Sequence, residues 1–95
     1  MKVKIEHNPV RCYFAAEADE ERAGLMTYQN AQPNIMVIDH TEVEPQFENK
    51  GIGTAMIMDC VYYARKNDKK IIPQCAFARV TFARKNDIHD VLFKM

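Results

Sequence analysis

Two glycines stand one residue apart in the stretch EPQFENKGIGTAM, residues 44–56, directly before a pattern typical of a helix. The first turn of a helix presents backbone N–H groups without intrahelical partners and a partial positive charge, so it binds phosphate readily. Glycine at Gly51 and Gly53 would let a phosphate approach the backbone without meeting a Cβ atom. The same spacing also suits a plain strand–helix turn, in which the glycines only permit close packing. From the residues alone, both interpretations stay open.

Two familiar nucleotide-binding motifs do not fit this segment. A Walker loop needs a Gly-Lys-Ser/Thr ending, whereas Lys50 precedes both glycines here. A Rossmann fingerprint needs a third glycine or alanine at the position of Met56, and an acidic residue after a second strand. We therefore expect neither a P-loop nucleotidase nor a dinucleotide-binding domain.

A second set of residues could move protons or carry an acyl group. Imidazole titrates near neutral pH, so His40 could act as a base, and Glu42 follows two residues later on the same side of an extended strand. Cys75 carries a thiol that could act as an acid or as a nucleophile. The structural alternatives are a hydrogen-bonded strand histidine, a solvated strand end and a small packed cysteine.

Composition limits the classes of partner. Hydrophobic residues make up 47% and charged residues 27% of the chain, so residues 1–95 are expected to form a single globular domain. Lys plus Arg and Asp plus Glu number 13 each, and a chain without net charge is not expected to attract nucleic acid or anionic membranes. No Cys-x-x-Cys or His-x-x-x-His pair occurs, so no metal site is expected.

The cellular location is also an expectation from the sequence. The first residues, MKVKIEHNPV, carry charges where a signal peptide has an apolar stretch. The three cysteines are odd in number and widely spaced, which favours reduced thiols over a disulfide framework. We therefore expect a cytoplasmic protein.

The first half of the chain reads as four strands. KVKIEH alternates polar and apolar residues, and the acidic turn EADEER between RCYFAAE and AGLMTYQ indicates a hairpin. The strongest strand is NIMVIDHTEV, with an apolar first half as in a strand covered on both faces. Strict alternation places Ile35, Val37, Asp39, Thr41 and Val43 on one side of it, and Met36, Ile38, His40 and Glu42 on the other.

Helices dominate the second half. Residues 51–67 carry an apolar stripe at helical spacing, formed by Ile52, Met56, Ile57, Cys60, Val61 and Ala64. Asn67 is expected to close this helix in a left-handed conformation. KIIPQC then reads as a short strand and AFARVTFARKN as a second helix. The order ββββαβα predicts an α/β (α+β) fold with a mostly antiparallel, twisted sheet, in which the fifth strand is parallel to the fourth.

The order of these motifs resembles the GNAT superfamily of acetyl-CoA-dependent N-acetyltransferases, in particular its short single-domain branch. The likeness runs from about residue 35 to residue 91 and includes VIDHTEV, EPQFENKGIGTA and KIIPQCAF. It implies the minimal acyl-CoA N-acyltransferase fold, in which a Gln/Arg-x-x-Gly-x-Gly/Ala turn wraps the coenzyme A pyrophosphate with backbone amides. That turn corresponds to residues 48–53, with Glu48 where the family has a neutral or basic residue. The implied coenzyme-binding residues are Val43, Asn49, Lys50, Gly51, Ile52, Gly53 and Thr54.

The resemblance also implies a reaction, which is transfer of acetyl from acetyl-CoA to a primary amine. His40 and Glu42 would then serve as the base and its partner. Larger relatives protonate the leaving thiolate with a tyrosine, whose place here falls near Phe82, so Cys75 is expected beside the acetyl group as the acid in a direct transfer. An acetyl-cysteine intermediate is the alternative mechanism. Two other functions remain open, an acetyl-CoA-binding module without turnover and a protein-interaction domain that keeps only the fold.

Overall fold

A five-stranded sheet forms the body of the molecule in the computed structural model, which describes residues 1–94. The strands lie in the order β1-β2-β3-β4-β5, with antiparallel pairing from β1 to β4 and parallel pairing between β4 and β5. The strands are β1 (Val3–Asn8), β2 (Tyr13–Ala18), β3 (Glu21–Gln32), β4 (Ile35–Val43) and β5 (Lys70–Pro73). This arrangement confirms the predicted fold class.

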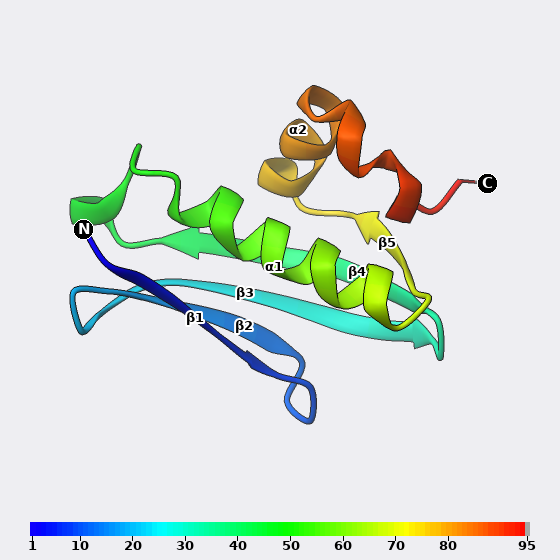
Figure 1. The fold of residues 1–95 in the computed structure, drawn as a ribbon, viewed down its shortest axis with the longest axis horizontal. Coiled ribbons are helices and arrows are strands. Elements are labelled where there is room, and N and C mark those ends of the chain that lie inside the picture. The colour runs from blue at the N-terminus through cyan, green and yellow to red at the C-terminus, as the bar shows by residue number, and fades with distance from the viewer. Residues whose placement is uncertain (95) are drawn as a thin grey trace.

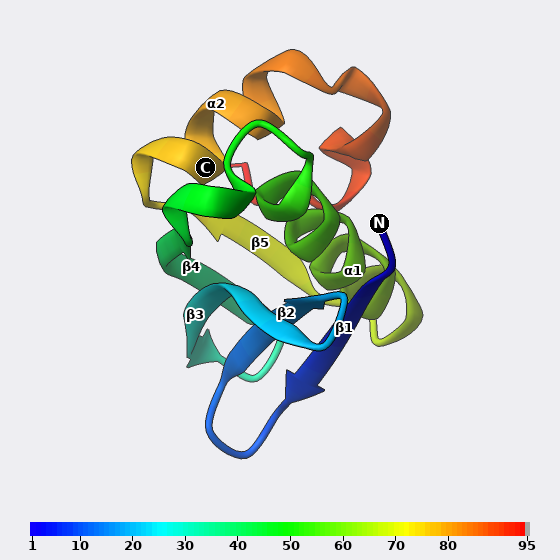
Figure 2. The same ribbon diagram turned by 90° about the vertical axis from the view of Figure 1, so that its left-hand side faces the viewer.

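Two α-helices and two short 3-10 helices complete the chain. Helix α1 crosses one face of the sheet and links β4 to β5, and helix α2 lies beside β5 near the start of α1 (Figures 1 and 2). Their bounds are η1 (Pro45–Phe47), α1 (Ile52–Lys66), α2 (Ala76–Arg84) and η2 (Asn86–Val91). The part of the chain that the structure describes contains no helix with the length and hydropathy needed to cross a membrane.

The apolar stripe of α1 packs against the sheet as its spacing predicts. The buried residues of α1 are Ile52, Gly53, Met56, Ile57, Cys60, Val61 and Ala64. On the sheet they meet Phe14, Met26, Met36 and Ile38, each fully buried. Burial of a large apolar side chain contributes about 1.5–3 kcal/mol, so this interface supplies much of the stability that fixes the start of α1 next to β4.

The end of α1 differs in detail from the prediction. Asn67 has a φ of −112° and is therefore not left-handed, whereas Asp68, one residue later, has a φ of 54°. The Asn67 amide Nδ2 donates to the Tyr63 carbonyl at 2.8 Å, and the Asn67 backbone N–H donates to the same oxygen at 3.1 Å. These two bonds hold Asn67 close to the last turn, so the chain reverses at Asp68.

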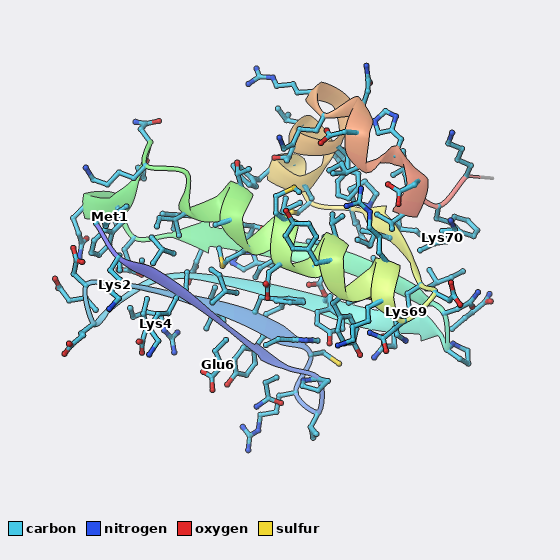
Figure 3. All side chains as sticks on the ribbon, in the orientation of Figure 1. Met1, Lys2, Lys4, Glu6, Lys69 and Lys70 are labelled. Carbon is cyan, nitrogen blue, oxygen red and sulfur yellow. The ribbon has the colours of Figure 1, made fainter. Side chains whose placement is uncertain are left out.

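Lysines secure the passage from α1 into β5. Lys69 Nζ donates to the Pro33 carbonyl at 2.6 Å, and the Lys70 backbone N–H donates to the Asn34 carbonyl at 2.8 Å. Both lysines lie at the end of the sheet where β5 begins, while Lys4 and Glu6 of β1 point away from α1 (Figure 3). These bonds anchor the amino end of β5 beside the start of β4.

A β-bulge in β4 overturns the strict alternation predicted for this strand. Tyr28 pairs with Ile38 and Thr27 pairs with His40, so Asp39 is the extra residue. From His40 onward, each side chain of β4 therefore points to the side opposite the one that strict alternation predicts. Thr41 pairs with Met26, which is buried, and Val43 pairs with Gly24, whose position faces Met56 and Ile52 of α1. The side of β4 that faces α1 is therefore formed by Met36, Ile38, Thr41 and Val43. His40 and Glu42 therefore lie on the opposite side from Met36 and Ile38. In the apolar first half of β4, for which cover on both faces is expected, Ile35, Met36 and Ile38 are buried and Val37 is half-buried.

Candidate active site

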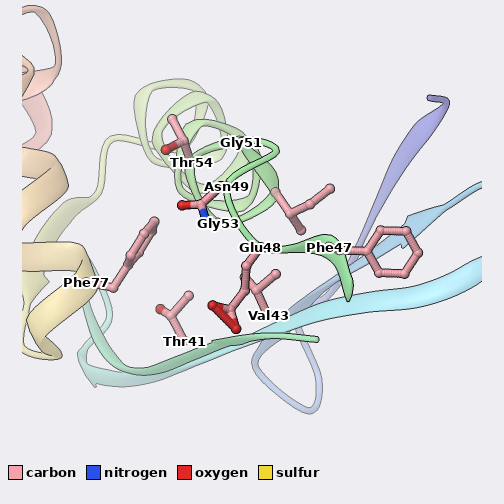
Figure 4. Close-up of a pocket in the computed structure, with 10 residues that line it drawn as sticks. Thr41, Val43, Phe47, Glu48, Asn49, Gly51, Gly53, Thr54 and Phe77 are labelled. Carbon is pink, nitrogen blue, oxygen red and sulfur yellow. The ribbon is translucent and has the colours of Figure 1, made fainter. Parts of the chain in front are cut away.

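A groove of about 400 Å³ opens between the end of β4, the turn after it and the start of α2 (Figure 4). Six of the seven predicted coenzyme-binding residues line it, namely Val43, Asn49, Gly51, Ile52, Gly53 and Thr54. Lys50, the seventh, is exposed and does not line the groove. The other lining residues are Thr41, Phe47, Glu48 and Phe77. The groove therefore gathers a strand end, a helix start and an aromatic ring.

The turn into α1 has the geometry of an anion site. Asn49 and Gly51 have φ values of 61° and 81°, in the left-handed region that favours glycine and asparagine. The first intrahelical hydrogen bond runs from the Ala55 N–H to the Gly51 carbonyl at 3.0 Å, and Gly51 makes no side-chain cap. The N–H groups of residues 52–54 therefore precede the helical ladder, and the first turn carries no acidic side chain.

Gly53 has a packing role that the sequence does not reveal. A Cβ atom built on Gly53 would stand 2.5 Å from Phe77 Cζ, so the Phe77 ring lies directly against the first turn of α1. Such a contact requires a residue without a side chain at position 53. The only sign of Phe77 in the sequence is its place two residues after Cys75, at the start of a predicted helix.

The sheet splits between β4 and β5 beside this groove. Pairing of β4 with β5 ends at Ile38 and Pro73, while pairing of β4 with β3 continues to Val43. The Ile38 carbonyl accepts both the Gln74 N–H at 3.0 Å and the Cys75 N–H at 3.1 Å. One carbonyl thus ends the parallel ladder and turns the chain away, which leaves a gap between the strands.

Cys75 and Thr41 meet across this gap. Cys75 is the half-buried N-cap residue of α2, and its Sγ lies 3.3 Å from Thr41 Oγ1. Thr41 faces the groove because of the bulge and is itself a lining residue (Figure 4). The predicted position of Cys75 at the strand gap therefore matches the structure, whereas Thr41 was not predicted, because alternation assigned that side of β4 to His40.

His40 and Glu42 form an exposed pair on the other face of β4. His40 Nε2 lies 3.3 Å from Glu42 Oε2, and both side chains are 58% exposed. Next to them Asp39 accepts the Thr27 hydroxyl at 2.6 Å and the Gln29 amide at 2.8 Å, and these hydrogen bonds lower the pKa of Asp39. The structure thus brings His40 and Glu42 together, but separates them from the groove by the thickness of the strand.

The groups that could serve as metal ligands or nucleophiles are scattered over the described residues. Among residues 1–94 no three His, Cys, Asp or Glu side chains gather closely enough to hold a metal ion. All three cysteines are free, with Cys60 buried and Cys12 and Cys75 half-buried. Burial raises the pKa of the Cys60 thiol to about 12, which makes it a core residue without nucleophilic character at neutral pH.

A comparison with models of known protein families assigns the chain to a family. The model of the GCN5-related N-acetyl-transferase family matches residues 12–91, which include β2 to β5, both α-helices and the groove. This chain is a GCN5-related N-acetyltransferase family member. No match was found among curated protein sequences.

Solved structures of this acetyltransferase family show the same fold. The solution structure of a Staphylococcus aureus protein, assigned as a GCN5-like N-acetyltransferase, has 26% identity and a TM-score of 0.77, and the match covers 97% of this chain and 89% of that one. An IAA acetyltransferase from Bacillus cereus has 15% identity and a TM-score of 0.67, with 87% and 75% covered.

A third structure carries the coenzyme. It is a Bacillus anthracis protein, assigned as a streptothricin acetyltransferase and solved in complex with acetyl coenzyme A, with 16% identity and a TM-score of 0.59. The match covers 76% of this chain but only 44% of that one. At this identity the likeness shows the shared fold, and the larger protein's acceptor is not carried over.

Proposed function

We propose that this protein binds acetyl-CoA in the groove at the start of α1 and transfers the acetyl group to a primary amine. One observation carries the proposal: the groove joins the free N–H groups of residues 52–54 to the strand gap where Thr41 meets Cys75. A diphosphate fits the first feature, because unpaired N–H groups and the helix dipole both favour anions. A thioester extended along the groove would end at the second.

In this proposal, different residues around the turn contact different parts of the coenzyme. Asn49 and Gly51 give the turn its left-handed backbone, Gly53 leaves room for the Phe77 ring, and Val43 offers its strand edge to the pantetheine amides. Lys50 stands beside the turn and supplies a cation to the phosphates. Glu48 lines the same groove with a negative charge, so its exposed carboxylate has to stay in water when the coenzyme binds.

The acetyl group would lie in the gap between β4 and β5, within reach of both faces of the sheet. The coenzyme enters from the α1 side. The amine would then approach from the opposite side, where His40 and Glu42 form their exposed pair. An open face of this kind suits an amine carried on a lysine, a protein N-terminus or a polyamine.

The proposed transfer is a direct one. The neutral amine attacks the thioester carbonyl, a C–N bond forms, the C–S bond breaks and coenzyme A leaves as a thiolate. The proton lost by nitrogen passes to the His40 imidazole, which Glu42 stabilises, and the thiolate takes a proton from Cys75. The His40 imidazolium then releases its proton to water and Cys75 takes a proton from water, so both groups return to their starting states. The free cysteines fit a reducing compartment, so we place the reaction in the cytoplasm.

Calorimetric titration with acetyl-CoA and with free coenzyme A tests the binding half of the proposal. We expect saturable binding that Gly53→Val abolishes while the far-ultraviolet circular dichroism stays that of the wild type. The matched control is Val80→Ala, which changes an exposed residue of α2 outside the groove. Unchanged affinity in Gly53→Val would refute this site.

Release of free thiol from acetyl-CoA in the presence of amines tests the second half. Amine-dependent release supports the transferase. Tight binding without release would instead support an acetyl-CoA-binding module, and absence of binding would leave a protein that keeps only the fold of the family.

A further inference from the structure

We propose that Thr41 is a positioning residue that holds the Cys75 thiol in the strand gap and sets its reactivity. The contact joins Thr41 Oγ1 and Cys75 Sγ at 3.3 Å, across two segments 34 residues apart in the chain. Its catalytic meaning rests on the proposed function, because a thiol in the gap matters only if an acyl group lies there. The contact itself can be tested without any coenzyme.

The bulge in β4 is the reason that a hydroxyl reaches this place. Without the extra residue Asp39, alternation from Ile38 would direct His40 toward the α1 side. With it, Thr41 takes that side, pairs with buried Met26 and lines the groove. A bulge commonly redirects a side chain next to a functional site.

The backbone of Cys75 is fixed independently of its side chain. Its N–H and that of Gln74 both donate to the Ile38 carbonyl, so the residue cannot shift along the gap. Cys75 also occupies the N-cap position of α2, yet its side chain makes no capping hydrogen bond. Within residues 1–94, the sulfur's hydrogen-bond partner is Thr41, and this contact selects the direction of the thiol.

The hydroxyl is suited to both protonation states of the sulfur. A threonine hydroxyl has one proton to donate and two lone pairs that accept, so it can pair with a thiol or with a thiolate. A hydrogen bond to an ionised acceptor is about twice as strong as a neutral one, so donation from Thr41 favours the thiolate. Removal of the hydroxyl should therefore make the Cys75 sulfur a slower nucleophile.

The rate of alkylation by iodoacetamide at one fixed pH measures this effect directly. The rate at Cys75 is followed by peptide mass spectrometry in the wild type, Thr41→Val and Thr41→Ser. Valine removes the hydroxyl at nearly constant shape, and serine keeps it. Cys12 immediately precedes β2, which β3 and β4 separate from the gap, and its alkylation in the same tube is the internal control.

We expect Thr41→Val to slow the alkylation of Cys75 by roughly threefold. Thr41→Ser should keep the wild-type rate, and the rate at Cys12 should not change in either variant. An unchanged Cys75 rate in Thr41→Val, or an equal loss in both variants, overturns the proposal. If Thr41→Val does not fold, Thr41→Ala is judged by the same criterion, because it also removes the hydroxyl.

Turnover supplies an independent readout. Thr41→Val should lower kcat by roughly tenfold, leave the KM for acetyl-CoA within about twofold, and be rescued by serine. An equal loss of kcat in Thr41→Val and Thr41→Ser would mean that Thr41 contributes only packing. Because alkylation needs no coenzyme, a slower Cys75 alkylation in Thr41→Val, together with a wild type that fails to bind acetyl-CoA, refutes the proposed function and leaves the contact standing.

Discussion

The ring of Phe77 rests on Gly53, so that a methyl group added to the glycine would meet Phe77 Cζ at 2.5 Å. Phe77 belongs to the first turn of α2 and is 41% exposed, while Gly53 belongs to the first turn of α1 and is buried. The contact therefore joins the starts of two helices that flank the groove. It predicts that the two positions are energetically coupled.

A double-mutant cycle on this pair tests the contact. In a helix, alanine is more stable than glycine by about 0.5–1 kcal/mol, but in the wild type the new methyl must displace the Phe77 ring. Gly53→Ala should therefore stabilise the Phe77→Ala variant more than the wild type, with a coupling of about 0.5–2 kcal/mol in urea unfolding. Additivity within about 0.3 kcal/mol would mean that the ring does not rest on the helix.

The buried face of α1 gives the second prediction. Met56 is fully buried against the sheet, and its Cε stands 2.9 Å from a Cβ built on Gly24. Met56→Ala should lower the free energy of unfolding by about 2–5 kcal/mol, because it leaves a cavity in close packing. Tyr62→Ala on the exposed face of the same helix is the control and should change stability by less than about 0.5 kcal/mol. Equal effects would contradict the assigned face.

Much of this fold could be predicted because it follows from local periodicity. The stripe from Ile52 to Ala64 has the angular spacing of a helix, and all of its members are buried as expected. The hairpin between β2 and β3 also lies where the acidic turn indicated, with Asp19 and Glu20 both at positive φ. Such features depend on neighbours within a few residues, which a sequence displays directly.

The rest depends on contacts between distant segments. The bulge at Asp39 arises where β4 pairs with β3, and no residue type in IDHTEV marks it. A single extra residue exchanges the two faces of a strand, so the sequence predicted His40 where the structure has Thr41. The Phe77 contact with Gly53 likewise joins two helices across the groove. Periodicity carries no information on either relationship.

Titration of His7 gives the third prediction. Its ring stacks on Phe14 with centroids 4.0 Å apart, and its Nε2 lies 2.6 Å from the Tyr28 hydroxyl. Burial lowers the pKa of His7, and the nearby Asp59 carboxylate opposes this in part. The unfolded chain therefore binds a proton at a higher pH than the folded protein does. Stability should be complete above about pH 6.5 and fall as the pH drops from there through the folded pKa.

Urea unfolding at pH 7.5, 6.5 and 5.5 measures this dependence, with His7→Gln as the matched control. Glutamine cannot titrate but can still bond to the Tyr28 hydroxyl. The difference in unfolding free energy between wild type and variant should shrink toward acidic pH. A difference that stays constant, or grows, would show that His7 is not kept neutral by the fold.

The fourth prediction separates catalysis from binding at His40. The side chain is 58% exposed, and its ion-pair partner within residues 1–94 is Glu42, an exposed contact worth about 0–1 kcal/mol. His40→Ala should therefore leave stability and acetyl-CoA affinity nearly unchanged and lower kcat by roughly 100-fold, the usual scale for loss of a base. His89→Ala, at the far 3-10 helix, tests whether any histidine change has this effect. Wild-type kcat in His40→Ala would remove the proposed base.

The last prediction decides between direct transfer and an acetyl-cysteine. Cys75 Sγ lies beside the proposed acetyl position and 3.3 Å from Thr41 Oγ1, so a thiolate there would be close enough to attack the thioester. The groove is open to water, however, and an acetylated cysteine within it would be exposed to hydrolysis. We therefore expect the intact mass of the protein mixed with acetyl-CoA, without an amine, to stay that of the free chain. Cys75→Ala should lower kcat by roughly tenfold or more through loss of the acid. An added acetyl group that disappears in Cys75→Ala would establish the two-step route instead, and full activity in Cys75→Ser would leave the residue with packing as its role.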